Sequence, residues 1–204
     1  MLASAPDRVG RFKVVLEDDS VLLLYRQTVQ DFCLYSGAEL SDEQLSQLQT
    51  AAGEMSAKMR AMRIVSASNV SKSDLQHRLI QKGETPEQAK AAVNWMSELS
   101  LIDDAKTAEL IVSRCIAKGY GLARAKQALY EKRIPKTLWE DALADYPEQI
   151  DKIVDFLESR LGEHASDKDV KRAIDALLRR GHSYGAVRKA LSQMSLDSEE
   201  FQED

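Results

Sequence analysis

The sequence predicts an all-α protein, an elongated and curved array of three tandem three-helix repeats behind a small β-hairpin-plus-helix N-terminal extension. The 204 residues include only 4 prolines and 9 glycines, so long stretches consist of helix-favouring residues. Apolar residues, 44% of the chain, recur at helical spacing from Ser41 onward. A pattern of about fifty residues then occurs three times, as repeat architectures require.

The segment 1–40 is predicted to contain an arm, a β-hairpin and a short helix. Residues 11–16 and 21–25 are rich in β-prone residues and flank an acidic turn, which is typical of a hairpin. The short helix is expected over 28–35, with Thr28 as its N-cap. Because an isolated hairpin is marginally stable, this segment should pack on the helices that follow.

The next segment begins with a capping-box pair, Ser41 and Gln44, which predicts a helix N-terminus. This helix is expected to end near Gly53, and a second helix with a Met-rich apolar face should run from there to Asn69.

The repeat is visible as an alignment without gaps. Residues 71–83 align on 121–133 at an offset of 50, and a further offset of 48 reaches the third copy. The aligned columns are Leu75/Ala125/Ala173, Leu79/Leu129/Leu177, Lys82/Lys132/Arg180 and Gly83/Arg133/Gly181. We expect a lead-in helix and the first repeat over 41–103, the second repeat over 104–147, the third over 148–196, and a disordered acidic tail over 197–204.

Residues at the corners agree with this plan. Thr85–Gln88 and Ser166–Asp169 are capping-box pairs. Gly83, Gly119 and Gly181 stand where helices should end in a left-handed residue.

Charge is unevenly distributed. Residues 57–196 hold 24 Lys/Arg against 19 Asp/Glu, although the whole chain has a net charge of −5. This mildly basic middle suits an anionic partner, and an ordinary solvated surface is equally compatible. Two distant cysteines and the lack of a long apolar run predict a cytoplasmic protein with reduced thiols and no contact with membranes.

No catalytic residue, metal site, cofactor or small-molecule ligand is predicted. His77, His164 and His182 are scattered, and no glycine-rich phosphate-binding loop is present. Asp103 and the following Asp104 could be paired carboxylates, but their place before an apolar helical run favours a helix cap. Cys115 lies on an apolar face and is expected to be a buried packing thiol.

The basic residues are the better candidates for function. Lys82, Lys132 and Arg180 recur at one position, either to bind a partner or to complement the dipole of their own helix. The second repeat doubles this charge with Arg133, which the dipole interpretation explains less well. The candidate partner-binding residues are Lys82, Lys118, Tyr120, Arg124, Lys126, Lys132, Arg133, Arg179 and Arg180.

Aromatic side chains near these cations could either pack in the core or stack on a partner. For Tyr120 and Tyr130 the core is the favoured interpretation. Trp95 and Trp139 fall on faces that are expected to be buried.

Three segments resemble the RecX family of recombinase regulators: Leu-Ile-Asp-Asp-Ala-Lys-Thr-Ala at 101–108, Lys-Gly-Tyr-Gly-Leu-Ala-Arg at 118–124 and Leu-Tyr-Glu-Lys-Arg-Ile at 129–134. The resemblance covers about residues 55–195. Three positions depart from the family pattern: Ser100 and Arg133 stand where glycine is usual, and Thr107 where an aromatic residue is usual.

The resemblance implies a non-enzymatic inhibitor of RecA. Such a protein would bind along the groove of the RecA filament on single-stranded DNA, and would suppress ATP hydrolysis, strand exchange and coprotease activity in recombinational repair and the SOS response. A weak direct contact with DNA is a further option.

Two other functions remain open. The stretch 121–143 could form a direct DNA-binding module like a helix-turn-helix, although its last helix, expected over 136–145, carries Asp141 and Asp145 and would repel phosphate. The chain could also be a generic helical scaffold for protein interactions.

Overall fold

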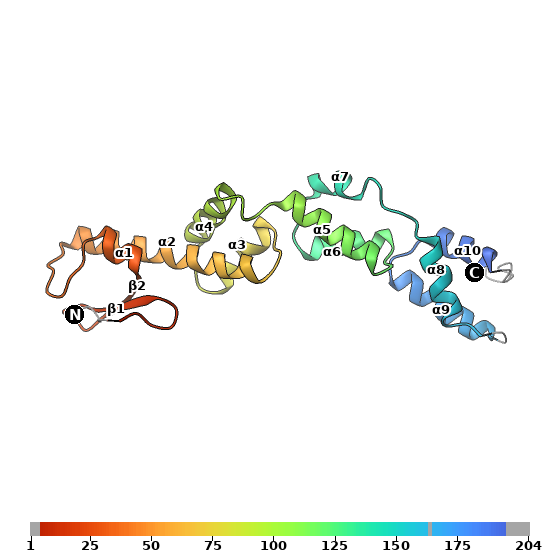
Figure 1. Cartoon of the computed structure of the whole chain (residues 1–204), viewed down its shortest axis with the longest axis horizontal. Coiled ribbons are helices and arrows are strands. Elements are labelled where there is room, and N and C mark those ends of the chain that lie inside the picture. Colours follow the sequence, from red (N-terminus) through yellow and green to blue (C-terminus); the bar gives the residue numbers. More distant parts are fainter. Residues whose placement is uncertain (1–4, 163–164, 195–204) are drawn as a thin grey trace. The chain divides into compact units, whose positions relative to one another are not determined.

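The predominantly helical fold is confirmed by a computed structural model that describes residues 5–162 and 165–194. The described chain contains ten α-helices, one short 3₁₀ helix and one two-stranded antiparallel sheet (Figure 1). It divides into two compact units, Met1–Ile102 and Asp103–Asp204, which we call unit 1 and unit 2 and describe separately. The predicted acidic tail, 197–204, lies outside the described residues.

Unit 1 contains the sheet and four helices. These are β1 (Arg11–Val15), β2 (Val21–Tyr25), α1 (Arg26–Asp31), α2 (Asp42–Ala67), α3 (Lys72–Gln81) and α4 (Pro86–Glu98). Unit 2 contains α5 (Asp104–Ala117), α6 (Leu122–Glu131), the 3₁₀ helix η1 (Lys136–Leu138), α7 (Trp139–Leu143), α8 (Ile150–Glu158), α9 (Asp167–Arg179) and α10 (Tyr184–Gln193).

The predicted hairpin is present and packs on α2. β1 and β2 pair antiparallel, with Val15 opposite Val21 beside the turn and Arg11 opposite Tyr25 at the open end. Leu24 is fully buried, and the Tyr25 hydroxyl accepts a hydrogen bond of 3.2 Å from the Arg63 guanidinium of α2. This contact supplies the support that a two-stranded sheet needs.

The first helix differs from its predicted limits. α1 begins at Arg26, directly after β2, with Tyr25 in the N-cap position. Thr28 therefore lies inside the helix, where it is buried, and the prediction that it caps the helix was wrong. No loop separates the strand from the helix, because Tyr25 ends β2 and Arg26 begins α1.

Gly53 does not end a helix, contrary to prediction. α2 is one helix of 26 residues that passes through Gly53 without a break. A Cβ at this position would collide with the side-chain amide of Gln88, which belongs to the capping box of α4. Glycine in a helix interior costs about 1 kcal/mol relative to alanine, but here it permits the close approach of α4.

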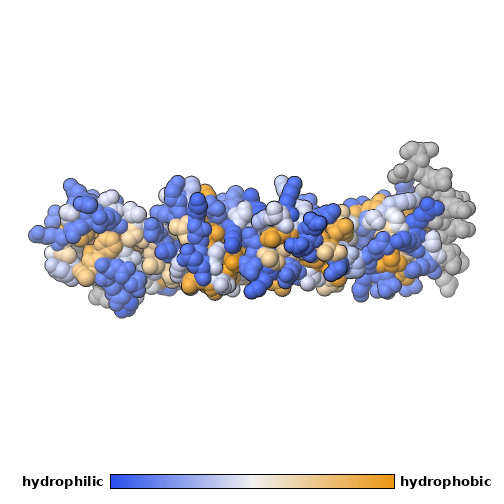
Figure 2. Space-filling model, turned by 90° about the horizontal axis from the view of Figure 1, so that it is seen from above, coloured by the Kyte–Doolittle hydropathy of each residue, from blue (hydrophilic) through white to orange (hydrophobic). Residues whose placement is uncertain are grey.

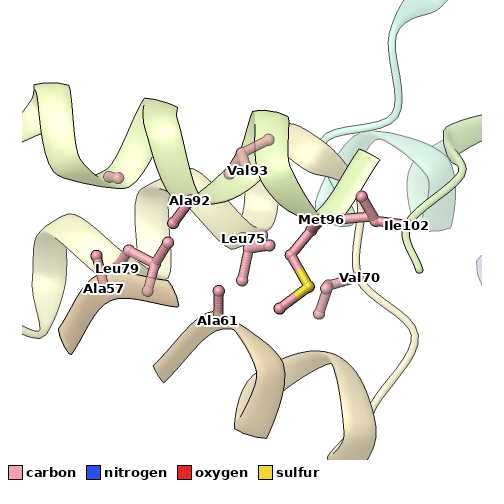
Figure 3. Close-up of a cluster of buried hydrophobic side chains, with 10 residues drawn as sticks. Ala57, Ala61, Val70, Leu75, Leu79, Ala92, Val93, Met96 and Ile102 are labelled. Atoms are coloured by element: carbon pink, nitrogen blue, oxygen red, sulfur yellow. The ribbon is translucent and has the colours of Figure 1, made fainter. Parts of the chain in front are cut away.

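The core of unit 1 lies between α2, α3 and α4. Ala57 and Ala61 of α2 face Leu75, Leu79 and the apolar side of α4 (Figure 3). Burying a leucine side chain contributes about 1.5–3 kcal/mol, and the small alanines let the helices approach closely. The predicted core position of Trp95 is met in part, since its ring is half-buried against this cluster.

The described residues of unit 2 form two apolar clusters. One joins α5, α6, η1 and α7 around Val112 and Leu129, and the other joins α8, α9 and α10 around Leu157 and Val187. Cys115 is buried, as predicted. Trp139 is half-buried, and its indole N–H donates a hydrogen bond of 3.1 Å to the carbonyl of Ile134.

The helix starts follow the sequence closely. All three predicted capping boxes form, at Ser41–Gln44, Thr85–Gln88 and Ser166–Asp169. Asp103 caps α5 by accepting hydrogen bonds of 2.9 and 3.1 Å from two backbone amides of its first turn, which confirms the favoured interpretation of that carboxylate. Thr107, which replaces the family's aromatic residue, is buried and donates a hydrogen bond to the Asp103 carbonyl.

The helix ends share one backbone conformation. The predicted left-handed glycines are confirmed at Gly83, Gly119 and Gly181, where φ is 93°, 64° and 88°. Ser100 and Arg133 adopt the same conformation, with φ of 55° and 54°, although neither is glycine. These are two of the positions that depart from the family pattern, so the helix termini are kept and the backbone carries the strain.

Candidate partner-binding surface

The corners after α3, α6 and α9 have the same hydrogen bonds. The amide of the left-handed residue donates to the carbonyl three residues back, at 2.9 Å in each corner. The next amide donates to the carbonyl five residues back, at 3.0–3.2 Å, which completes a Schellman motif. This second residue is buried in every corner, as Glu84, Ile134 and His182.

Each corner also exposes one large apolar side chain at the same aligned position. Ile80, Tyr130 and Leu178 follow the buried leucine of their helix and are exposed by 41%, 65% and 41%. The expectation that Tyr130 packs in the core was therefore wrong. Figure 2 shows separate hydrophobic areas among hydrophilic ones on the face it presents. Singly exposed apolar residues are common, so these three are distinguished only by their shared aligned position.

Cations follow these apolar residues. Lys82, Lys132 and Arg180 are the C-cap residues of α3, α6 and α9, where a positive charge complements the helix dipole. Lys82 is exposed and Lys132 half-buried, while Arg133 and Arg179 are exposed beside them. Each corner thus combines an exposed apolar group with at least one basic residue.

Within unit 2, a backbone joint connects the α5–α6 turn to the α9–α10 turn. The amides of Gly121 and Ala123 donate hydrogen bonds of 3.0 and 3.1 Å to the carbonyls of Arg180 and Gly181. A Cβ on Gly121 would collide with the Gly181 carbonyl, and a Cβ on Gly181 would collide with the backbone of Arg124. Only glycine allows the two turns to approach so closely. We call these contacts the glycine joint.

Four of the predicted site residues meet at the glycine joint: Lys118, Tyr120, Arg124 and Arg180. The guanidinium of Arg180 lies near two aromatic rings, 5.8 Å from the centroid of Tyr120 and 5.0 Å from that of Phe156. Arg180 therefore makes cation–π contacts inside unit 2, in addition to any role toward a partner.

The remaining contacts of the joint fix its backbone. The Tyr120 carbonyl accepts hydrogen bonds of 2.6 Å from the Tyr146 hydroxyl and from the Gln149 amide. Burial raises the pKa of Tyr146 to about 12, so the hydroxyl stays protonated and remains a donor. Arg124 forms a 3.2 Å ion pair with Glu131 along α6.

His182 attaches the third corner to the joint. Its Nε2 lies 3.0 Å from the Gly119 carbonyl, which requires the proton on Nε2, and its buried Nδ1 has no hydrogen-bond partner among the described residues. Burial lowers the pKa of His182, the bond to Gly119 opposes that effect, and the charge of Arg180 adds to the lowering. The neutral imidazole is thus the form that fits.

The other predicted residues lie elsewhere. Lys126 is exposed on α6, and Lys132 and Arg133 stand at the C-terminal end of that helix, about 15 Å along its axis from its first residue. Lys82 belongs to unit 1. Unit 2 therefore holds two basic groups, one at the glycine joint and one at the end of α6.

The sequence interpretation missed Glu84 and Lys152. Glu84 is buried and forms a 2.7 Å ion pair with Arg60 of α2, while Lys152 of α8 lies beside the glycine joint. Glu84 could have been found from the repeat alignment, because it shares a column with His182. Nothing in the local sequence marks Lys152.

In the described parts of the chain, no helix is long and apolar enough to cross a membrane. The same residues contain no group of three or more His, Cys, Asp or Glu side chains that could hold a metal ion.

Known proteins resemble this chain in sequence and in fold. The family profile described as "RecX, second three-helix domain" matches residues 103–143. Regulatory protein RecX of Vibrio parahaemolyticus is 27% identical over 141 residues, covering 68% of this chain and 91% of that protein. Regulatory protein RecX of Lactobacillus delbrueckii subsp. bulgaricus is 29% identical over 198 residues, covering 93% and 72%.

Solved structures agree in fold. The crystal structure of a regulatory protein RecX superposes with a TM-score of 0.66 at 21% identity, covering 93% of this chain and 97% of that one. The structure of RecX from Lactobacillus salivarius gives a TM-score of 0.63 at 21% identity, covering 72% and 99%. The sequence matches identify regulatory proteins RecX as relatives of this chain, and the superpositions show that it shares their fold.

Proposed function

We propose that this protein is an inhibitor of the RecA recombinase that binds along the groove of the RecA filament on single-stranded DNA. It acts without catalysis of its own, by occupying the filament and thereby suppressing ATP hydrolysis, strand exchange and coprotease activity. Its place of action is the cytoplasm, in recombinational repair and the SOS response. Relatives named regulatory protein RecX support the regulatory part of this proposal.

One observation carries the proposal further: the recurrence of one exposed apolar residue, followed by basic residues, at the same corner of α3, α6 and α9. A filament presents the same surface on each successive subunit. A chain with equivalent surfaces on its successive repeats can contact several filament subunits at once. Linked contacts of this kind raise the overall affinity without any single strong contact.

The proposal is tested first with the unmodified protein. Purified protein should lower the single-strand-dependent ATP hydrolysis of its cognate RecA at substoichiometric ratios, because one bound molecule affects several subunits. An unchanged rate at an equimolar ratio would exclude inhibition of RecA.

The corner residues are tested with a triple variant, Ile80→Ser with Tyr130→Ser and Leu178→Ser. These side chains are exposed, so the fold should persist while the concentration needed for half-inhibition rises at least about tenfold, a loss of about 1.4 kcal/mol or more. The matched control is Leu99→Ser with Leu110→Ser, which removes side chains exposed by 48% and 45% outside the aligned position. Equal inhibition by the triple variant and the control would reject the corners as contact residues.

Direct DNA binding is the second candidate function. It predicts a mobility shift of DNA by this protein in the absence of RecA, with strong salt dependence. η1 and α7, which would supply the recognition helix, are only three and five residues long, and α7 carries Glu140 and Asp141 in its first turn. These carboxylates would face phosphate unfavourably, so the RecA proposal is preferred. A generic scaffold would instead tolerate reversal of Lys132 and Arg133 to glutamate.

A further inference from the structure

A polar pocket of about 220 Å³ opens beside the glycine joint of unit 2. Lys118 at the end of α5, Lys152 of α8 and Arg180 at the end of α9 line it, together with the Gly119 backbone and the Phe156 ring. No carboxylate is among these lining residues. Three basic side chains from three separate elements thus line one cavity. Only the tertiary fold brings them together.

Within the described part of the chain, carboxylates neutralise these three positive charges only weakly. The Lys152 ammonium lies 3.8 Å from the Asp155 carboxylate, with both side chains more than half exposed, which makes a weak pair. Neither Lys118 nor Arg180 forms an ion pair with a described carboxylate. Like charges that are only weakly compensated repel one another, and a bound anion reduces that repulsion.

The arginine in the pocket is held in place before any ligand arrives. Its guanidinium makes cation–π contacts with the Tyr120 and Phe156 rings, and one of its nitrogens donates a 3.5 Å hydrogen bond to the Lys118 carbonyl. A guanidinium has five N–H donors, so several remain for a ligand. Because the side chain is already ordered, binding loses less entropy than it would at a free arginine.

The positive charges also affect the pKa values of two neighbouring groups. Burial raises the pKa of the Cys115 thiol, and the charges of Arg124 and Lys118 oppose that rise. Burial lowers the pKa of His182, and Arg180 adds to the lowering after the opposing bond to Gly119. The contributions of Lys118, Arg124 and Arg180 to these two pKa values have the sign expected of positive charges close to the thiol and the imidazole.

We infer that this pocket is an anion site that binds a phosphate group, carried either by a free phosphate ester such as a nucleotide or by a nucleic-acid backbone. Phosphate fits better than carboxylate because it presents three or four oxygens in a tetrahedron to donors that come from three sides. The inference concerns the protein alone and does not depend on the proposed action on RecA.

The test follows the backbone amide resonances of Lys118 and Gly119 in the full chain by NMR during titration with two probes, inorganic pyrophosphate and a short thymidine oligonucleotide. Both amides should shift with at least one probe. A response to pyrophosphate alone assigns the site to a small free phosphate ligand, and a response to the oligonucleotide assigns it to the backbone phosphate.

The pocket variant is Lys118→Gln with Lys152→Gln, which changes two exposed side chains and leaves the glycine joint intact. It should bind the responding probe at least about tenfold more weakly, because two charge-assisted contacts are lost. The matched control, Lys168→Gln with Lys171→Gln, removes the same charge from exposed positions of α9 outside the pocket and should bind as the unmodified protein does.

The inference is overturned if neither probe shifts these amides, if the pocket variant and the control weaken binding equally, or if a glutamate oligomer shifts the amides when both phosphate probes fail. The last outcome would identify an acidic protein segment as the occupant.

Discussion

The corner after α3 in unit 1 and the corner after α9 in unit 2 have the same backbone conformation but are attached to their surroundings by different chemistry. In the first, the buried Glu84 carboxylate pairs with Arg60 of α2 at 2.7 Å and accepts a long hydrogen bond of 3.4 Å from Ser56. In the second, His182 bonds a carbonyl, and two glycines allow backbone hydrogen bonds between turns.

This difference shows which features of a corner are common to the repeats and which depend on the neighbouring segment. The Schellman hydrogen bonds and the buried leucine belong to the repeat itself, because they satisfy the end of one helix locally. The residue after the left-handed position instead faces whatever segment precedes it, and that segment differs from unit to unit. The backbone conformation of the corner is therefore the same in each repeat, while the contacts of the residue after the left-handed position differ.

The largest effect is expected at the glycine joint. Gly121→Ala places a Cβ against the Gly181 carbonyl and should destabilise unit 2 by about 3 kcal/mol through overpacking and lost backbone hydrogen bonds. Denaturant unfolding followed by Trp139 fluorescence, in a Trp95→Phe background, measures the change. Gly185→Ala in α10 is the control, since its Cβ meets no atom closer than 4.0 Å. Equal stability of the two variants would mean that the joint does not hold unit 2 together.

The attachment in unit 1 should be weaker. Arg60→Ala leaves the Glu84 carboxylate buried without its counterion and should cost about 2 kcal/mol, less than a fully buried pair because the Arg60 side chain is 34% exposed. Trp95 fluorescence in a Trp139→Phe background reports unit 1. Adding Glu84→Gln to Arg60→Ala should recover part of the loss, and a double variant no more stable than Arg60→Ala would argue against a charge effect.

A smaller, pH-dependent effect is expected in unit 2 alone. Because burial lowers the pKa of His182 below its ordinary value of 6.5, the unfolded state binds more protons than the folded state as pH falls through 6.5. Stability attributable to His182 is therefore complete above that pH and decreases below it, until the folded-state pKa is passed. His182→Gln keeps an N–H donor near Gly119 and should remove this dependence. An unchanged pH profile of unfolding in His182→Gln would assign it to other groups.

The smallest effects concern the left-handed positions themselves. Arg133→Gly should stabilise unit 2 by about 1 kcal/mol, because glycine adopts φ of 54° without steric strain. Gly83→Ala should destabilise unit 1 by a similar amount, since a Cβ there meets no atom within 4 Å and only the backbone conformation resists it. Thermal unfolding compares the two variants. Shifts of the same sign would contradict a common backbone strain.

Local signals in the sequence predicted the helix termini well, and Arg133 shows why. The alignment placed it in a glycine column, and it adopts the glycine conformation, because helix-end hydrogen bonds depend on a few neighbouring residues. Gly53 shows the limit. This glycine lies inside α2 and does not end a helix. Its missing side chain leaves room for Gln88 from a distant segment.

The site could be predicted only in part for the same reason. The basic residues at the ends of α3, α6 and α9 were visible in the repeat, but the exposure of Tyr130 was not, because the apolar pattern of an isolated helix does not say which neighbours will cover it. Arg180 was placed among residues that face a partner, yet two aromatic rings hold it inside unit 2.

By itself, the sequence determined the repeat, the helix starts that a capping side chain marks, and the Schellman corners at three glycines, since the caps and corners depend on hydrogen bonds within a few residues. The tertiary structure alone decided how the corners are attached. The pairing of Glu84 with Arg60, the close approach of Gly121 to Gly181, and the convergence of Lys118, Lys152 and Arg180 on one pocket join residues at least 24 positions apart. Such contacts arise only when packed helices bring distant segments together, and no local pattern records them.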